Sequence, residues 1–203
     1  TSIYSGAVVG LAEAWYKEKG FSSFHFFNDN KEWNRFDKVG HIYSAYHYGR
    51  IGTSSLKWAN ISEKKAIVYG SLIGFFYQLP IEIFDGFSKS YGASWGDLVA
   101  NFAGSGLWLG QNILWNEERI HFKYSFHRTS YAPIRPNVLG DGWTQEWLKD
   151  YNGQTYWLSF DLYALTGKRQ FIPKWLNIAI GYGAQEMVSG FESSNNTLGY
   201  YSY

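Results

Sequence analysis

Two long segments with almost no charge limit most strongly what this chain can fold into. Residues 66–84 contain one formal charge, at Glu82, and residues 98–115 contain none. Each segment is close to the roughly 20 residues that a helix needs to cross about 30 Å of hydrocarbon. Polar side chains within them, such as Asn101 and Gln111, are costly when they face lipid. The segments therefore predict either helices that enter a membrane or helices that are buried in a bundle.

The pattern of the first half predicts four helices in all. They are expected over 2–18, 33–58, 62–86 and 94–115. Pro80 lies inside the third helix and should kink it, because proline lacks an amide hydrogen. Ser94 and Asp97 have the spacing of a capping pattern, which should begin the fourth helix.

The second half has a different pattern, which predicts strands. Residues alternate with a period of two, and Asn152-Gly153 is a strong turn signal. Strands are expected over 121–126, 155–162 and 175–182, with a short helix over 143–150 and a loose tail over 189–203. The expected fold is mainly α: a four-helix membrane-associated bundle at about residues 2–115, followed by a small antiparallel β segment at about residues 120–187. The corresponding domains are a helical domain over 1–117 and a β-rich, aromatic segment over 118–203.

The composition limits the classes of partner. Aromatic residues make up 21% of the chain, whereas charged residues make up only 17%. Tyr and Trp combine an apolar body with a polar tip, so this excess indicates a membrane interface or a large interaction surface. The net charge of +1 provides no basic stripe for nucleic acid. The sequence contains no cysteine, which excludes disulfides, Cys-ligated metals and thiol catalysis, and no cofactor is expected.

Glycines four residues apart predict close packing of helices. The pairs are Gly6/Gly10, Gly70/Gly74 and Gly106/Gly110, on three different expected helices. Small residues at this spacing let two helix backbones approach each other closely. The mean hydropathy of −0.31 is too polar for a conventional polytopic membrane protein. We therefore expect partial embedding in a membrane, or docking against another membrane protein.

Six polar side chains form pairs, each on one face of an expected helix. Ionisable groups in such apolar helices must pair with one another, because an unpaired buried charge is very costly. We therefore expect the six to converge in one polar cluster. They are Asp37 and His41, Glu82 and Asp85, and Asp97 and Asn101.

The sequence leaves three roles open for this polar cluster. The first is a polar lock that fixes the register of the helices, with Asp37 orienting His41. The second is a metal site with nitrogen and oxygen ligands from His41, Glu82, Asp85 and Asp97. The third is acid–base catalysis, for which the candidates are His41, Asp37 and Glu82. No G-x-S-x-G, H-E-x-x-H or P-loop motif is present, so no catalytic residue is assigned.

The order of these residues resembles a known bacterial family. The segments Asp37-Lys38-x-x-His41, Glu82-x-x-Asp85-Gly86 and Asp97-x-x-Ala100-Asn101-x-x-Gly104 are similar to those of the YfiM-like family of envelope lipoproteins. The resemblance covers roughly residues 33–112, and a fainter similarity extends to VanZ-like membrane proteins. The flanking segments resemble a longer version of the family from Bacteroidota.

The resemblance implies an exported protein at the outer membrane or on the periplasmic face of the cell envelope. It implies no particular activity, since the family has none established. The sequence departs from the family in having no lipobox cysteine. Membrane association of the chain as given is therefore expected from its helices, its aromatic surface or its strands.

Two functions follow as hypotheses. The first is a non-catalytic accessory or structural subunit at the outer membrane, whose partners are membrane lipid and a larger envelope complex such as a secretion or uptake machine. The second is an envelope enzyme or metal-binding protein, which would act on a lipid or cell-wall substrate through His41 and nearby carboxylates.

Overall fold

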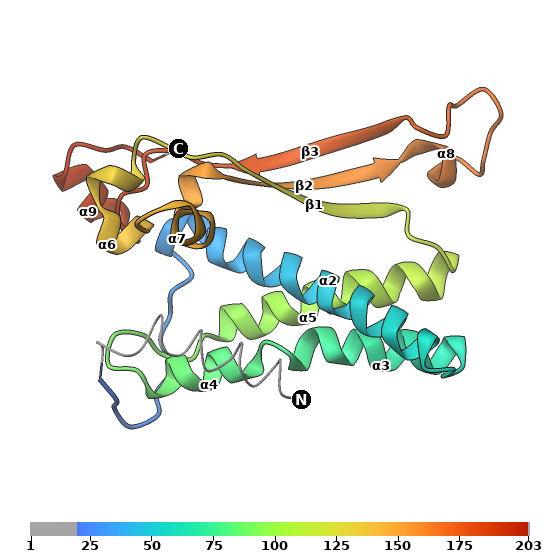
Figure 1. The fold of residues 1–203 in the computed structure, drawn as a ribbon, viewed down its shortest axis with the longest axis horizontal. Coiled ribbons are helices and arrows are strands. Elements are labelled where there is room, and N and C mark those ends of the chain that lie inside the picture. The colour runs from blue at the N-terminus through green and yellow to red at the C-terminus, as the bar shows by residue number, and fades with distance from the viewer. Residues whose placement is uncertain (1–19, 203) are drawn as a thin grey trace. The chain divides into compact units, whose positions relative to one another are not determined.

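A computed structural model describes residues 20–202 and confirms the expected fold class (Figure 1). The described chain is mainly helical and contains a three-stranded antiparallel sheet. It divides into two compact units: a helical unit of residues 20–30 and 44–109, and a β unit of residues 31–43 and 110–202. The expected helix over 2–18 and the glycines Gly6 and Gly10 lie outside the described residues. The domain boundary after residue 117 stays a prediction.

The helices of the first half begin and end close to the expected positions. They are α2 (Phe36–Trp58), α3 (Glu63–Phe76), α4 (Leu79–Phe87) and α5 (Trp95–Trp115). The expected third helix is interrupted between α3 and α4, and Pro80 lies in the first turn of α4. Proline fits there because the amide groups of a first turn have no partner within the helix. The sequence placed the distortion correctly but did not predict two separate helices.

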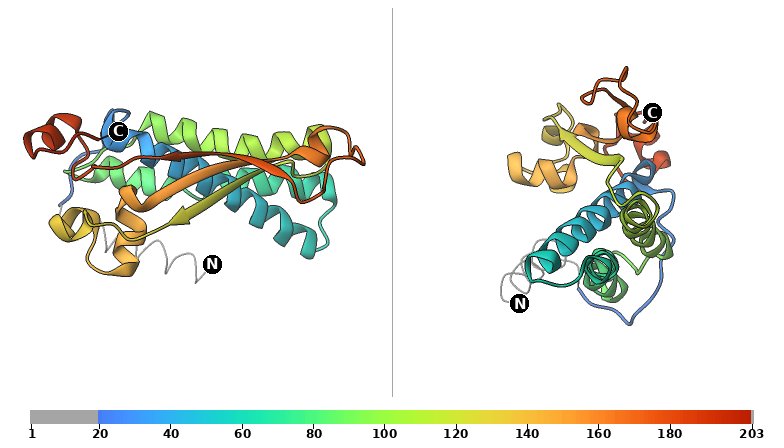
Figure 2. Two further views of the ribbon diagram at one scale, coloured as in Figure 1. Left: turned by 90° about the horizontal axis from the view of Figure 1, so that it is seen from above. Right: turned by 90° about the vertical axis from the view of Figure 1, so that its right-hand side faces the viewer.

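Close packing in the helical unit occurs where glycines of α3 meet α2; Figure 2 shows these two helices from two further sides. A Cβ atom on Gly70 would lie 2.3 Å from the amide nitrogen of Thr53, and one on Gly74 would lie 2.4 Å from the carbonyl oxygen of Ala45. Any side chain larger than hydrogen would therefore separate the two backbones. By contrast, a Cβ atom on Gly106 or Gly110 of α5 would meet no atom of residues 20–202 within 4 Å. The predicted close packing is not seen at this second pair in the part of the chain that the structure describes, because both glycines face open space.

The β unit is built on three antiparallel strands in the order β1-β2-β3. They are β1 (Ile120–Phe126), β2 (Gln154–Asp161) and β3 (Asn177–Gly183). The register is regular, since Tyr124 pairs with Tyr156 and Tyr156 pairs with Tyr182. Short helices connect or follow the strands: α6 (Pro136–Leu139), α7 (Trp143–Lys149), α8 (Leu162–Leu165) and α9 (Glu192–Thr197).

Aromatic rings form the core of the β unit, on the sheet face that packs against the first turns of α2. Phe36 is fully buried and stacks on Tyr182 with ring centroids 5.0 Å apart. Tyr43 lies edge-on to Phe122 at 5.5 Å and to Tyr156 at 5.6 Å. Such ring pairs stabilise the fold beyond the burial of their area, by about 1 kcal/mol each.

The prediction of a loose tail over 189–203 is wrong for the residues that the structure describes. The tail contains α9, and Asn195 within it is only 2% exposed. The Asn195 side-chain oxygen accepts hydrogen bonds from the backbone amides of Val188 and Ser189. This one buried side chain fixes the tail, because leaving its polar atoms unbonded would be costly.

Candidate functional site

The helical unit contains a group of buried polar side chains on α4 and at the start of α5. Gln78 and Glu82 are both 4% exposed, Asp97 is 4% exposed, and Asn101 is fully buried. Gln78 Nε2 donates a hydrogen bond of 2.6 Å to Asn101 Oδ1. This bond joins α4 to α5 in a part of the chain whose outer residues are apolar.

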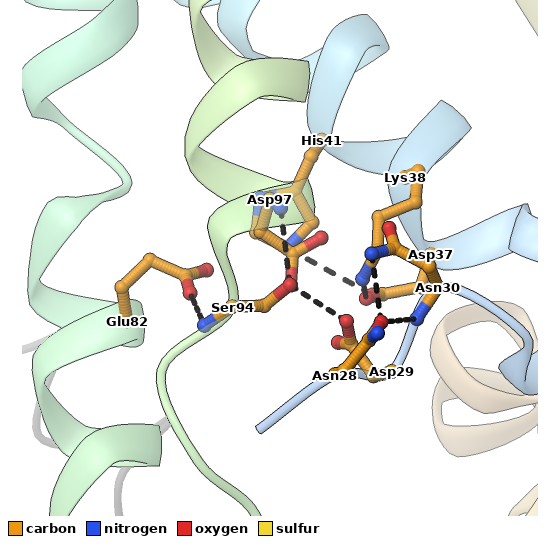
Figure 3. Close-up of polar contacts among 9 residues, drawn as sticks. All are labelled: Asn28, Asp29, Asn30, Asp37, Lys38, His41, Glu82, Ser94 and Asp97. Carbon is orange, nitrogen blue, oxygen red and sulfur yellow. Dashed lines mark hydrogen bonds and ion pairs between the residues drawn. The ribbon is translucent and has the colours of Figure 1, made fainter. Parts of the chain in front are cut away.

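Ser94 connects the other members of this group (Figure 3). Its backbone amide donates to Glu82 Oε2 at 3.0 Å, and its hydroxyl donates to Asp29 Oδ1 at 2.6 Å. The same hydroxyl accepts a hydrogen bond of 3.2 Å from the backbone amide of Asp97. Ser94 therefore caps the first turn of α5, as its spacing from Asp97 predicted.

The charges of Glu82 and Asp97 suit their position at the beginning of α5. A helix N-terminus carries unbonded amide groups and a partial positive charge, so carboxylates there are stabilised. The Glu82 carboxylate comes from α4 and Asp97 belongs to the first turn of α5 itself. This geometry agrees with a polar lock, in which acids hold two helix ends together.

Asp37 and His41 belong to the β unit and lie close to each other within α2. His41 Nε2 lies 3.8 Å from Asp37 Oδ1, and Lys38 Nζ lies 3.1 Å from Asp37 Oδ2. The His41 and Lys38 side chains are 12% exposed, whereas that of Asp37 is 35% exposed. One carboxylate thus faces two basic groups from its own helix, as the i, i+4 spacing of Asp37 and His41 predicted.

The residues expected to form one polar cluster belong to different units: Asp37 and His41 to the β unit, and the other four to the helical unit. Asp97 and Glu82 are both bonded to Ser94, and Asn101 is bonded to Gln78. Asp85 is partly buried on α4. Convergence of all six residues stays a prediction, as do the metal ligands His41, Glu82, Asp85 and Asp97 and the catalytic candidates His41, Asp37 and Glu82.

Sequence reasoning missed two members of the polar group. Asp29 accepts from Ser94 across a large sequence separation, and Gln78 donates to Asn101. A signal for Gln78 was available, since it precedes Glu82 by four residues and so lies on the same face of the helix. No comparable signal pointed to Asp29, which lies in a loop.

The β unit contains ionisable groups of its own, outside the predicted cluster. Arg128 binds Glu146 with two hydrogen bonds, and these lower the pKa of the Glu146 carboxyl below its ordinary value. Burial raises the pKa of the Tyr124 and Tyr156 hydroxyls, so both stay neutral. An open cavity in this unit is lined by His127, Asn152, Gln154, Thr155 and residues 183–185. None of these is a candidate catalytic residue.

The outer faces of the helical unit are unusually apolar. On α3 the side chains of Val68, Tyr69, Leu72, Ile73 and Phe76 are between 39% and 55% exposed. On α5, Val99 and Phe102 are 66% and 69% exposed. Among the described residues one helical stretch, Glu63–Phe87, has the length and composition to cross a membrane, and only 33% of its most apolar part is buried. Large exposed apolar faces of this kind mark contacts with a membrane or another protein.

Comparison with known proteins gives one match. Residues 25–110, less than half of the chain, match the model of a family described as predicted periplasmic lipoproteins (DUF2279). No curated protein and no solved structure matches the chain significantly. The match covers the segments that carried the resemblance. It supports a relationship of this region to an uncharacterised family of envelope lipoproteins. The YfiM-like and VanZ-like resemblances stay predictions. The match confirms the expected location at the periplasmic face of the cell envelope.

Proposed function

We propose that this protein is a non-catalytic accessory subunit of the outer membrane. Its helical unit would lie in the membrane, and its β unit would bind a larger envelope complex of the secretion or uptake type. The observation that carries this proposal is the distribution of side chains in the helical unit. Hydrogen-bonded polar groups are inside and large apolar groups are outside. Lipid has no water with which polar groups could bond, so a protein that enters it satisfies them internally.

The dimensions of the helices support embedding. The stretch Glu63–Phe87 has 25 residues in the two successive helices α3 and α4, which would span about 37 Å at 1.5 Å per residue if they were collinear. The helix α5 has 21 residues, or about 31 Å. Both lengths are close to the ~30 Å of a hydrocarbon core.

The two ends of the stretch carry the residue types that favour a membrane surface. At the turn between α2 and α3, Trp58 is 91% exposed and stands among Lys57, Lys64 and Lys65. At the beginning of α5, Trp95 is 64% exposed and stacks on Phe26 with ring centroids 4.7 Å apart. Trp and Lys side chains prefer the headgroup region, where their apolar parts and their polar ends are both accommodated.

Membrane binding is tested with charges on the apolar face of α5. In the double variant Val99→Lys/Phe102→Lys, both changes are at exposed positions and should leave the fold of the unit intact. A lysine costs about 3 kcal/mol at the centre of a bilayer, and less at these two positions, which lie about 6 and 10 Å along α5 from Trp95. We expect the variant to lose at least tenfold in binding to vesicles made from outer-membrane lipids. Equal binding of variant and wild type would contradict the proposal.

The matched control places the same charges on the β unit. Leu198 and Tyr201 are 52% and 67% exposed, so Leu198→Lys/Tyr201→Lys adds the same charge at similarly exposed positions. This variant should bind vesicles like the wild type.

In cells, density separation of the two membranes should place the wild type in the outer-membrane fraction. Recovery with the inner membrane would overturn the outer-membrane part of the proposal.

The contact with a larger complex is proposed for α7. Its side chains Trp143, Trp147 and Leu148 are 61%, 39% and 40% exposed, and exposed Trp residues are frequent anchors of protein interfaces. We expect Trp143→Ala/Leu148→Ala to remain in the membrane but to run at a smaller size on a native gel. An unchanged native size would contradict this contact.

A further inference from the structure

The outer edge of β3 has the properties of a strand that pairs with another strand. Among the described residues β3 pairs only with β2. All seven of its residues are exposed. Ile178 and Ile180 are 55% and 67% exposed, although they lie on the sheet face that also carries Tyr182, whose ring stacks on the buried Phe36. An edge strand of this kind offers backbone amide and carbonyl groups to an incoming strand.

The register of the sheet shows which residues of β3 offer these groups. The amide of Asp161 donates to the carbonyl of Arg119, so the odd-numbered residues of β2 bond toward β1. In an antiparallel sheet the even-numbered residues then bond toward β3. Ile178, Ile180 and Tyr182 are their partners. The amide and carbonyl groups of residues 177, 179, 181 and 183 therefore point to the outer edge.

Natural edge strands usually carry features that prevent pairing, and β3 has none of the common ones. Its sequence, Asn177–Gly183, contains no charged residue and no proline. Its pairing with β2 is continuous from Asn177 to Gly183, without a bulge. Charges, prolines and bulges are the usual means by which proteins block an edge. Their absence from β3 leaves the edge competent to pair.

We propose that β3 pairs with β3 of a second copy of this chain, antiparallel and centred on Ile180. This register overlaps the two strands completely. It opposes Asn177 to Gly183 and Ala179 to Gly181, so the outward backbone groups of one copy meet those of the other. It also places Ile180 opposite Ile180 and Ile178 opposite Tyr182, in the closely spaced pairs where side chains pack well.

The charges on either side of β3 favour a second copy in this antiparallel orientation. The segment before the strand carries Arg169 and Lys174, besides Lys168, which pairs with Glu117 of its own copy, and the segment after it carries Glu186 and Glu192. Antiparallel pairing brings the basic end of one copy beside the acidic end of the other. Parallel pairing would bring like charges together, which is unfavourable. A strand from another protein would need a matching charge pattern, whereas a second copy has it.

The test uses single cysteines, since the sequence contains none of its own. Ile180→Cys places two thiols directly opposite each other at the symmetry axis, within reach of a disulfide. Ile178→Cys is the matched control, because each new thiol would face Tyr182 of the other copy and the two thiols would be about 13 Å apart along the strands. The full-length protein is treated with diamide in native membranes. We expect at least half of the Ile180→Cys protein, and under a tenth of the Ile178→Cys protein, to run as a covalent dimer.

The other outcomes overturn the proposal. Equal cross-linking of both variants would indicate random collision in the membrane. No cross-linking of Ile180→Cys, or its attachment to a different protein, would show that this edge does not bind a second copy. Diamide treatment of intact cells repeats the test without isolating membranes, so its outcome does not depend on the proposed function.

A charge-swap experiment checks the same contact without oxidation. Ile180→Lys and Ile180→Glu should each reduce the wild-type dimer at least tenfold, because like charges would face each other across the symmetry axis. Coexpressed with two different tags, the two variants should purify together. Ile134→Lys changes a residue that is 50% exposed in the same unit and should leave the dimer unchanged. Failure of the two variants to purify together would overturn the pairing about Ile180.

Discussion

The helical unit and the β unit both bury polar side chains, but those side chains have different partners. In the helical unit Gln78 bonds to Asn101, and Glu82 bonds to the amide of Ser94 at the start of α5. In the β unit Asn152 bonds to the backbone of Met187, and Asn195 bonds to that of Val188. One unit thus uses buried polar groups to join helices, and the other uses them to fix loops.

A second difference lies in the packing of the backbones. Both units bury large rings, Phe36, Phe122 and Tyr156 in the β unit and Tyr46 and Trp108 in the helical unit, and both expose apolar side chains. Only in the helical unit do glycines, Gly70 and Gly74, also bring two helix backbones together among the described residues. Helices that associate in lipid also rely on small residues and polar contacts, because burial of apolar surface gives them little advantage there. Substitutions in each unit test this contrast.

The largest effect is expected at the glycine contact between α3 and α2. In Gly74→Leu the new side chain would overlap the carbonyl of Ala45, since even a Cβ atom would lie 2.4 Å from it. A backbone cannot yield as a flexible side chain can, so we expect a loss of about 3 kcal/mol or more in the free energy of unfolding. Thermal unfolding in mild detergent, followed by circular dichroism, measures this loss.

The control is Gly106→Leu, at a glycine that has open space around it. The sequence predicted disruption at both positions, whereas the structure predicts it only at Gly74. Leucine at position 106 should be tolerated, and its higher helix propensity favours it by about 0.8 kcal/mol. Equal losses at the two sites would mean that the contrast between them is wrong.

A smaller effect is expected from the buried bond between α4 and α5. Asn101→Leu removes the acceptor of Gln78 Nε2 and leaves a buried donor without it, which costs about 2 kcal/mol. The double variant Gln78→Leu/Asn101→Leu removes both polar groups and should recover about half of that loss. Unfolding of the single and double variants in a mutant cycle measures the coupling. Additive losses would show that the two side chains do not act together.

Much of the fold could be predicted because its signals are local. The period-two alternation predicted β1, and the Asn152-Gly153 turn predicted the start of β2. Both predicted ranges lie within two residues of the observed strand bounds. Ser94 and Asp97 gave the start of α5 for the same reason, since a cap involves residues three apart. The tail was mispredicted because Asn195 acts through Val188 and Ser189, contacts that no helix or strand period reveals.

The candidate site was less predictable because its bonds cross between elements. The i, i+4 rule correctly paired Asp37 with His41 on α2. It could not find the bond from Gln78 to Asn101, because a period relates residues of one helix only. It also could not separate Gly74 from Gly106, since both belong to the same motif and differ only in what faces them.

In the β unit, a moderate effect is expected where a ring covers a glycine. A Cβ atom on Gly181 of β3 would lie 2.6 Å from the Trp157 ring, whereas the nearest atom to one on Gly183 would lie 3.5 Å away. Gly181→Ala should therefore force the ring to move and cost about 1 kcal/mol. Gly183→Ala should be neutral or slightly stabilising, because it only restricts the unfolded chain. Urea unfolding compares the two, and an equal response would show that the ring does not constrain β3.

The smallest effect is expected from the ion pair of the buried Glu146 with Arg128 in the β unit, and it depends on pH. Arg128 lowers the pKa of Glu146 in the folded protein, so the pair contributes fully above the ordinary carboxyl pKa. The contribution is lost as the pH falls through the lower folded-state value, because the carboxyl then takes up a proton. Between pH 6 and pH 3 the wild type should therefore lose more stability than Glu146→Gln, as measured by the urea midpoint. Arg128→Met should reduce the same pH dependence, because it removes the guanidinium that lowers the pKa of Glu146. A pH dependence that persists unchanged in both variants would have to come from other carboxylates.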